Sequence, residues 1–454
     1  MTMVDDRAAK SPAATPAKYK VGIVGFGYIG SVIGACLADK GCDVLGIEID
    51  PRTVDLTNQG KTEHFEPQLP ELIARSASAG RLSASGDFAR LKEVDYVVVT
   101  VGTPLDAEFK ADLRYINAAA DAIARHLRAG QSVVLKSTVI PTITRDVFGA
   151  KLAAASGLTP GKDFHLAFSP ERIAEGKAVK EFLSLPIVVG ADDDASAEKI
   201  CAFWRDALGV ETIKVSSTIG AELTKLADNL WIDMNIAVAN QIAKVCQAHG
   251  ADFDEVQKAA NTLPKGQHHV NILQSSIGVG GSCLTKDPLF FAHLLDQAGH
   301  DGRLIREARA INDRMPAHAA QTIAQWLNAN GKKTGKVAVL GVAFKNDTND
   351  LRYTPVLPLL GELKTRGLSY QITDPHVAPA NARVLFGADN DLVSWQDAVA
   401  NADALCFACG HTVYRALDLA LLKAKTAAKC LFVDGRHSFS RQSVTAAGFE
   451  YIVI

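Results

Sequence analysis

The stretch that decides the fold is Val21-Gly22-Ile23-Val24-Gly25-Phe26-Gly27-Tyr28-Ile29-Gly30, an apolar run that leads into glycines spaced G-x-G-x-x-G. A helix of small residues is expected next, up to Lys40-Gly41, followed by a second apolar run over residues 44–48. This order of strand, turn, helix and strand is typical of a dinucleotide-binding unit. The first glycine permits the tight turn, the second lets a pyrophosphate approach the helix N-terminus, and the third allows close helix–strand packing.

The acid at the end of the second run indicates which dinucleotide is bound. Glu48 would accept hydrogen bonds from the adenosine ribose and would repel a 2′-phosphate, so NAD is favoured over NADP. Arg52 lies just beyond it and keeps NADP open as an alternative. The expected cofactor site comprises Gly25, Gly27, Tyr28, Ile29, Gly30, Glu48, Arg52, Thr103, Thr138 and Glu175.

Further apolar runs over residues 95–101, 132–136 and 164–168 are continuous, as strands buried on both faces should be. Ligands of open parallel sheets bind at the carboxyl ends of the strands. The residues that follow these runs are therefore expected near the nicotinamide, although each could instead be a helix cap or turn residue. They are Thr103, Thr138, Glu171 and Glu175.

The middle of the chain predicts one long helix. Apolar residues recur every three or four positions from Ile219 to Val245, which indicates about 30 residues and a length of about 45 Å, ending at Gly250. Lys225 and Asn229 share one face of it. A solvated polar stripe is the usual explanation for such a pair, but the mostly apolar surroundings favour a cleft.

A glycine-rich loop with a thiol follows in the same helical segment. It reads Gly278-Val279-Gly280-Gly281-Ser282-Cys283-Leu284-Thr285-Lys286-Asp287. A lysine or a glycine-rich turn beside a thiol stabilises the thiolate, which is the nucleophilic form. From this stretch alone, a nucleophile and a buried structural cysteine are both open.

The last third predicts a second doubly wound sheet, without G-x-G-x-x-G in its first turn. Phe344, Lys345 and Arg352 follow its first strand, and cations at strand ends suit a diphosphate. Its apolar runs cover residues 336–341, 368–373, 404–408 and 430–433.

Composition excludes several classes of function. A net charge of −2 gives no case for nucleic acid or an anionic membrane, and no apolar run is long enough to span a bilayer. The eight cysteines are scattered, so we expect a reducing cytoplasm and no metal site. Cys406 and Cys409 are expected to be core thiols. Residues 1–18 predict a disordered tail and not a signal peptide.

These motifs together resemble the UDP-glucose/GDP-mannose dehydrogenase family of nucleotide-sugar 6-dehydrogenases, from about residue 20 to the C-terminus. The resemblance implies an α/β fold in which two Rossmann-like doubly wound parallel sheets are joined by a central helical segment. The expected domains are an NAD-binding domain over 19–205, a central dimerisation domain over 206–315 and a UDP-sugar-binding domain over 316–454. The matching motifs lie at residues 25–30, 102–106, 137–139, 169–176, 222–229, 278–287, 341–345 and 350–352.

The resemblance implies a four-electron oxidation of the C6 alcohol of a UDP-sugar to a carboxylate, with two NAD reduced. Cys283 would attack the intermediate aldehyde, Lys225 and Asn229 would stabilise the oxyanion, and the thioester would then be hydrolysed. Candidates for activating the water are Asp287, Glu171 and Thr138. The expected substrate contacts are Glu171, Arg172, Lys225, Asn229, Gly280, Lys286, Phe344, Lys345 and Arg352.

The identity of the sugar rests on smaller details. Ser169-Pro170-Glu171-Arg172 and Gly410-His411 resemble the branch that acts on N-acetylhexosamines, so we expect UDP-N-acetylmannosamine first and UDP-N-acetylglucosamine next. Glu175-Gly176 and Ser282-Cys283 are closer to the UDP-glucose type, which is the alternative. GDP-mannose comes third. A difference at C2 of the sugar is only a few atoms, and discrimination of that size depends on pocket contacts that a sequence does not display.

Two other classes of protein have to be distinguished from a nucleotide-sugar dehydrogenase. A two-electron hydroxyacid dehydrogenase would need neither the cysteine loop nor the second sheet. A nucleotide-sugar sensor without catalysis would not need Cys283, Lys225, Asn229 and Asp287 together. The family further implies a homodimer or higher homo-oligomer through the long helix and a role in polysaccharide biosynthesis.

Overall fold

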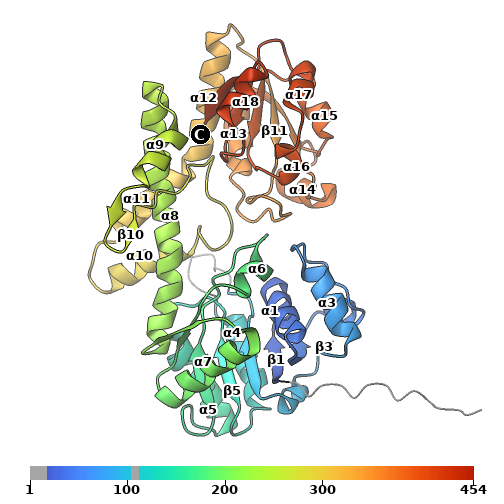
Figure 1. The fold of residues 1–454 in the computed structure, drawn as a ribbon, viewed down its shortest axis with the longest axis vertical. Coiled ribbons are helices and arrows are strands. Elements are labelled where there is room, and N and C mark those ends of the chain that lie inside the picture. Colours follow the sequence, from blue (N-terminus) through green and yellow to red (C-terminus); the bar gives the residue numbers. More distant parts are fainter. Residues whose placement is uncertain (1–17, 104–111) are drawn as a thin grey trace, which may run out of the picture. The chain divides into compact units, whose positions relative to one another are not determined.

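The computed structural model describes residues 18–103 and 112–454, which form two compact units (Figure 1). The first unit holds residues 18–103, 113–173 and 177–222. The second holds Asp112 with residues 174–176 and 223–454. The tail expected over residues 1–18, except Lys18, and residues 104–106 of one family motif lie outside the described part of the chain.

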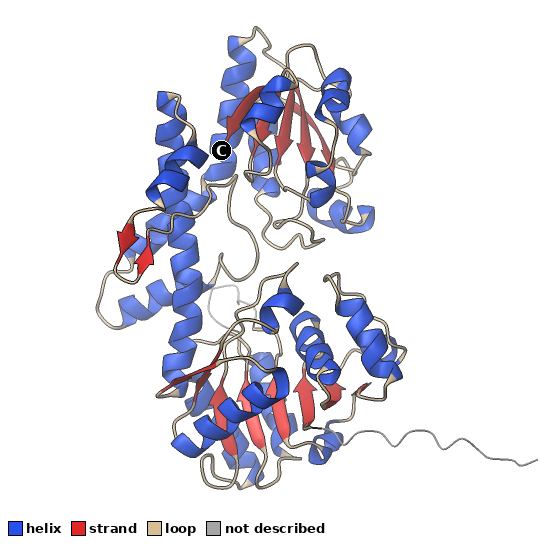
Figure 2. Cartoon of the chain, in the orientation of Figure 1, coloured by secondary structure: helices blue, strands red, loops and turns tan. Residues whose placement is uncertain are grey.

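The first unit is built on an eight-stranded sheet in the order β3-β2-β1-β4-β5-β6-β7-β8, with helices against it (Figure 2). Neighbouring strands are parallel except β6 and β7. The chain reverses its strand order between β1 and β4, which is where such sheets bind ligands. The strands are β1 Lys20–Val24, β2 Asp43–Ile47, β3 Leu82–Ser85, β4 Tyr96–Val99, β5 Ser132–Leu135, β6 His165–Phe168, β7 Ile187–Gly190 and β8 Thr212–Val215.

Strand β4 shows why the apolar runs became strands. Tyr96 and Val98 belong to the core on one face of the sheet, and Val97 and Val99 to the core on the other. Alternate side chains of a strand point to opposite faces, so a strand covered on both sides must be apolar throughout. The helices of this unit are α1 Tyr28–Asp39, α2 Pro51–Asn58, α3 Leu69–Ser78, α4 Arg114–Ala124, α5 Ala150–Ser156, α6 Ala178–Phe182 and α7 Asp194–Leu208, with short turns of other helix types over Phe88–Glu93 and Ile143–Gly149.

Helix α8, Thr218–His249, is the predicted long helix and has 32 residues. It ends where Gly250 takes a positive φ of 70°, a conformation that glycine adopts without strain. The boundary between the two units falls inside it, after Glu222. The elements that follow are α9 Phe253–Ala260, β9 Pro264–Lys265, β10 His268–His269, α10 Asp287–Gln297, α11 Arg303–Asp313 and α12 Met315–Ala329.

A second, five-stranded parallel sheet completes the second unit, in the order β12-β11-β13-β14-β15. Cys406 and Cys409 are both fully buried there, as expected. Its strands are β11 Lys336–Leu340, β12 Ser369–Thr373, β13 Ala404–Phe407, β14 Leu431–Asp434 and β15 Glu450–Val453. Its helices are α13 Val356–Thr365, α14 Pro379–Phe386, α15 Trp395–Val399, α16 Thr412–Arg415, α17 Leu419–Lys425 and α18 Arg441–Ala446.

The expected fold class, two Rossmann-like sheets with a helical segment between them in the chain, is confirmed. Strand β8 belongs to the first sheet although it lies beyond residue 205. In the described part of the chain, no helix combines the length and apolarity that a membrane span requires.

Candidate functional site

The glycine turn after β1 has the geometry of a dinucleotide cradle. Gly25 has a φ of +86°, and a Cβ added to Gly30 would lie 2.1 Å from the carbonyl oxygen of Gly25, so neither position accepts a side chain. A Cβ added to Gly27, which precedes α1, would meet no atom within 4 Å. The backbone is thus open where the pyrophosphate is expected at the helix N-terminus.

Glu48 lies at the carboxyl end of β2 and binds the backbone of the glycine turn. Its carboxylate accepts the backbone N–H groups of Phe26 at 2.8 Å, Ile49 at 2.7 Å and Asp50 at 3.1 Å. A carboxylate offers about four acceptor positions, so one remains for a ribose hydroxyl. The guanidinium of Arg52 forms an ion pair with Glu63 at 3.1 Å. The residues present therefore fit a dinucleotide without a 2′-phosphate.

Tyr28 has a partner that sequence reasoning did not find. Its hydroxyl donates to the buried carboxylate of Glu66, which also accepts the backbone N–H of Ala178 at 2.8 Å. The ring of Tyr28 meets that of His64 edge to face. Ile29 packs against the core of the first unit. Glu66 is far along the chain from the glycine motif, so the spacing of that motif could not predict its contact with Tyr28.

The carboxyl ends of β4, β5 and β6 bring three of the predicted residues to one edge of the sheet. The Thr103 hydroxyl donates to the carbonyl oxygen of Thr138 at 2.7 Å. Glu171 follows β6, and its Oε1 accepts the N–H groups of Arg172 at 2.7 Å and Ile173 at 2.9 Å. Its Oε2 lies 3.4 Å from Nζ of Lys136, a buried lysine that was not predicted.

Glu171 and Glu175 do not share a helix face, because no helix forms between β6 and α6. Glu175 belongs to the second unit, where it accepts a hydrogen bond from Arg352 at 2.9 Å. Arg352 also binds both carboxylate oxygens of Asp350. Burial and the charge of Asp350 raise the pKa of Glu175 to about 7, against the opposing charges of Arg352 and Lys345.

The thiol of Cys283 is exposed, whereas the other seven cysteines are buried. Its loop packs on the segment after β11: a Cβ on Gly280 would lie 2.6 Å from that of Phe344, and one on Gly281 would lie 2.7 Å from the Phe344 ring. The N–H of Gly281 also donates to the carbonyl oxygen of Arg352 at 3.0 Å. Packing on Phe344 therefore requires both glycines, and the backbone hydrogen bond to Arg352 fixes the loop that carries the thiol.

Helix α8 presents a buried polar face to this loop. Lys225 and Asn229 are both buried, and Asn229 donates to Oδ2 of Asp287 at 2.5 Å. Nζ of Lys286 lies 3.9 Å from Asp287 and 5.5 Å from the centre of the Phe290 ring. Burial raises the pKa of Asp287, against the charges of Lys286 and Lys225 and the hydrogen bond from Asn229.

The same polar face continues to residues that the sequence did not single out. Asp233 is buried and accepts from Arg309 at 2.5 Å and from Asn312 at 2.8 Å. Arg309 also donates to the carbonyl oxygen of Leu284, next to the thiol, at 3.2 Å. Asp233 follows Asn229 at the same spacing as Asn229 follows Lys225, and this repetition was the available signal.

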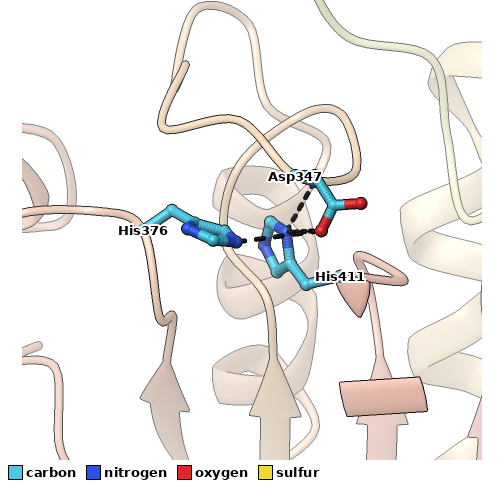
Figure 3. A group of neighbouring side chains, drawn as sticks. All are labelled: Asp347, His376 and His411. Atoms are coloured by element: carbon cyan, nitrogen blue, oxygen red, sulfur yellow. Dashed lines mark hydrogen bonds and ion pairs between the residues drawn. The ribbon is translucent and has the colours of Figure 1, made fainter. Parts of the chain in front are cut away.

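Two histidines and one carboxylate form a group just beyond the carboxyl ends of β11, β12 and β13 (Figure 3). They are Asp347, His376 and His411. His411 accepts the backbone N–H of Asp347 on Nδ1 at 2.8 Å, and its Nε2 lies 3.1 Å from Asp374. The carboxylate of Asp347 accepts from the N–H and hydroxyl of Thr412. Because both ring nitrogens of His411 are engaged, together with both oxygens of Asp347, we assign the group to support of the strand ends.

Models of one protein family match the chain in three consecutive parts. They are described as the NAD binding domain, the central domain and the UDP binding domain of the UDP-glucose/GDP-mannose dehydrogenase family, over residues 19–208, 220–314 and 338–441.

Individual relatives match over nearly the whole chain. A UDP-glucose 6-dehydrogenase of Haloferax volcanii is 32% identical over 439 residues, 95% of this chain and 99% of that protein. A UDP-N-acetyl-D-mannosamine dehydrogenase of Pyrococcus horikoshii is 30% identical over 420 residues, 92% of this chain and 95% of that protein. The solved structure of a UDP-glucose dehydrogenase from Pyrobaculum islandicum matches with a TM-score of 0.84 at 28% identity, covering 96% of this chain and 99% of that one.

Proposed function

Because this chain belongs to the UDP-glucose/GDP-mannose dehydrogenase family, we propose that it oxidises the C6 hydroxyl of a UDP-N-acetylhexosamine to a carboxylate. The chain is an NAD-dependent UDP-sugar dehydrogenase. The observation that carries the four-electron proposal is the exposed thiol of Cys283 beside the buried polar face of α8. A two-electron hydroxyacid dehydrogenase has no use for a nucleophile at that position.

The thiol is needed for the second of two oxidations. Gly25, Gly27 and Gly30 would hold NAD, which would supply the hydride acceptor for C6. The alcohol gives up one hydride and one proton to become an aldehyde, which has no further hydride to give until a nucleophile adds. The Cys283 thiolate forms a bond to the aldehyde carbon, and the resulting thiohemiacetal loses the second hydride to become a thioester.

Lys225 and Asn229 are assigned to the oxygen of this adduct. Both lie on one face of α8 and both side chains are buried, so their donors are held in a site of low dielectric. Asn229 is fixed by Asp287, which accepts from its amide. Donors that are already oriented stabilise an oxyanion without reorganisation at the moment of reaction.

Hydrolysis completes the reaction. Water adds its oxygen to the thioester carbon, one of its protons passes to a base, the carbon–sulfur bond breaks, and the Cys283 thiolate leaves. Asp287, Glu171 and Thr138 are the candidates for orienting this water or taking its proton. Phe344, Lys345, Arg352, Lys286, Gly280 and Arg172 are assigned to the sugar and its diphosphate.

UDP-N-acetylmannosamine is the substrate we favour, followed by UDP-N-acetylglucosamine. The Ser169-Pro170-Glu171-Arg172 motif supports this choice, as does the name of the Pyrococcus horikoshii relative. UDP-glucose is the alternative, because the relative from Haloferax volcanii is named for that sugar at a similar identity. GDP-mannose is the least favoured of the nucleotide sugars.

The proposal includes a homodimer, or a higher homo-oligomer, formed through α8. Leu223, Trp231, Val238 and Val245 are exposed on this helix. Their spacing of seven or eight residues places them on one side of it. A cytoplasmic location and a product used in polysaccharide biosynthesis complete the proposal.

The test is NADH production at limiting sugar, run to completion with UDP-N-acetylmannosamine, UDP-N-acetylglucosamine, UDP-glucose and GDP-mannose in parallel. We expect two NADH per molecule of an acetylated sugar. Two NADH with UDP-glucose alone would support the four-electron reaction but identify UDP-glucose as the substrate. For a Cys283→Ser variant we expect formation of the acid to fall more than about 100-fold. A variant that makes the acid at the parent rate would overturn the covalent mechanism, and one NADH per sugar would overturn the four-electron reaction.

A further inference from the structure

A lysine lies buried at the carboxyl end of β5, where the core gives no structural reason for a charge. Lys136 is 2% exposed, and its ammonium lies 5.8 Å and 5.4 Å from the ring centres of Phe182 and Trp204. Lysine is almost never fully buried unless it is paired, because removal of its charge from water is costly. An apolar side chain would fill the same space without that cost, so the charge itself needs an explanation.

The charged partner of Lys136 is a residue already assigned to the reaction. Nζ lies 3.4 Å from Oε2 of Glu171 and donates to the carbonyl oxygen of Pro170, also at 3.4 Å. The two backbone N–H groups on Oε1 hold the other side of the same carboxylate. The carboxylate is thus fixed from both ends, by amides on one oxygen and by an ammonium near the other.

This arrangement leaves room for a further donor on Oε2. Within the described part of the chain, that oxygen is buried and has no hydrogen-bond partner, and the ammonium 3.4 Å away is its ion-pair partner. A small cavity of about 20 Å³, large enough for one water, adjoins the pair; its lining includes Lys136 and Glu171 together with apolar residues such as Phe182 and Ile187. A water that donates to Oε2 would meet a carboxylate whose negative charge is held by the ammonium.

We propose that Lys136 is a positioning residue for Glu171: its buried ammonium orients this carboxylate toward the water that hydrolyses the thioester, from which the carboxylate takes a proton. The inference rests on the proposed function. Lys136 touches neither the sulfur nor the carbon in this step. It acts through Glu171, which receives the proton as the carbon–sulfur bond breaks.

The experiment uses the whole enzyme with NAD and UDP-N-acetylmannosamine, or with UDP-glucose if the sugar panel selects it. A Lys136→Met variant keeps the volume and the apolar contacts with Phe182 and Trp204 but removes the charge. We expect its steady-state rate to fall at least about 10-fold. The first two hydride transfers persist as a burst of NADH, and acid quench with mass spectrometry shows a sugar adduct on Cys283.

Three further variants sharpen the result. Lys136→Arg keeps the charge and should restore the steady-state rate and remove the accumulated adduct. Lys151→Met, which removes a partly exposed lysine of the same unit, should leave the rate unchanged. Lys136→Gln is made alongside in case the methionine variant does not fold, and the same outcomes apply to it.

A steady-state rate equal to that of the parent in an uncharged variant would overturn the proposal. Slow NADH formation without an adduct would overturn it too, since Lys136 would then act before hydrolysis. If the parent enzyme itself yields one NADH per sugar and no adduct, the proposed function fails. That result differs from the two variant results above, which would overturn only the role of Lys136.

Discussion

At the scale of single residues, the carboxylates of Glu175 and Asp350 both accept hydrogen bonds from the guanidinium of Arg352. Burial and the charge of Asp350 raise the pKa of Glu175 from 4.5 to about 7. Between these two values the folded protein holds a proton that the unfolded chain releases. Its free energy of unfolding therefore falls as the pH rises through this window, and the loss is complete above about pH 7.

A Glu175→Gln variant tests the direction in which stability changes with pH. The amide resembles the protonated acid, so at pH 4.5 the melting temperatures of variant and parent should agree. At pH 8 the variant should melt about 2–4 °C above the parent, because it lacks the buried charge. Circular dichroism melting at both pH values measures the difference. A parent that gains stability relative to the variant between pH 4.5 and 8 would show that Arg352 outweighs burial.

How far the site could be predicted depended on the kind of residue. Cys283, Lys225 and Asn229 stood out because motif and helical spacing mark them in the sequence. Lys136 and Asp233 did not, because their importance comes from burial beside a distant partner, Glu171 or Arg309. A lysine at the end of a strand gives the same local pattern whether it is solvated or enclosed by aromatic rings.

At the scale of elements, most interior strands were predicted, whereas both edge strands of the first sheet and the interior strand β7 were not. Strands β4, β5 and β13 are buried along their whole length and read as continuous apolar runs. Strands β3 and β8 lie at the two edges of the first sheet, where part of each strand faces solvent. Their sequences, Leu-Ser-Ala-Ser and Thr-Ile-Lys-Val, carry no such run because edge strands need less apolar surface.

The start of α3 carries a strained backbone that a substitution should relieve. Gln68 precedes this helix with a φ of 71° and a ψ of −14°, a left-handed conformation that costs a residue with a side chain about 1–2 kcal/mol. A Gln68→Gly variant should raise the melting temperature by about 2–4 °C. Gln59→Gly is the matched control, because Gln59 ends α2 at a φ of −83° and glycine there should lower stability. Equal shifts in both variants would contradict this explanation.

At the scale of the whole molecule, α8 buries polar and apolar side chains together and also leaves apolar ones exposed. Its buried residues include the polar Lys225, Asn229 and Asp233 as well as Leu226 and Ala237. Trp231 and Val238, on the other side, are 58% and 53% exposed. A soluble helix normally turns its apolar stripe inward, so an apolar stripe left at the surface indicates a surface covered by another chain. A second copy of α8 offers the matching surface for a twofold dimer.

A Val238→Asp variant tests this dimer, because it would place an unpaired carboxylate in the centre of the interface. Burial of an unpaired charge costs several kcal/mol, so the dissociation constant should rise more than about 100-fold. Sedimentation velocity at micromolar concentration should show a dimer for the parent and a monomer for the variant. Val384→Asp is the matched control, since Val384 is 89% exposed on α14 and should leave the dimer intact. A parent that sediments as a monomer, or a Val238→Asp variant that remains a dimer, would remove α8 as the interface and leave its apolar side without a partner.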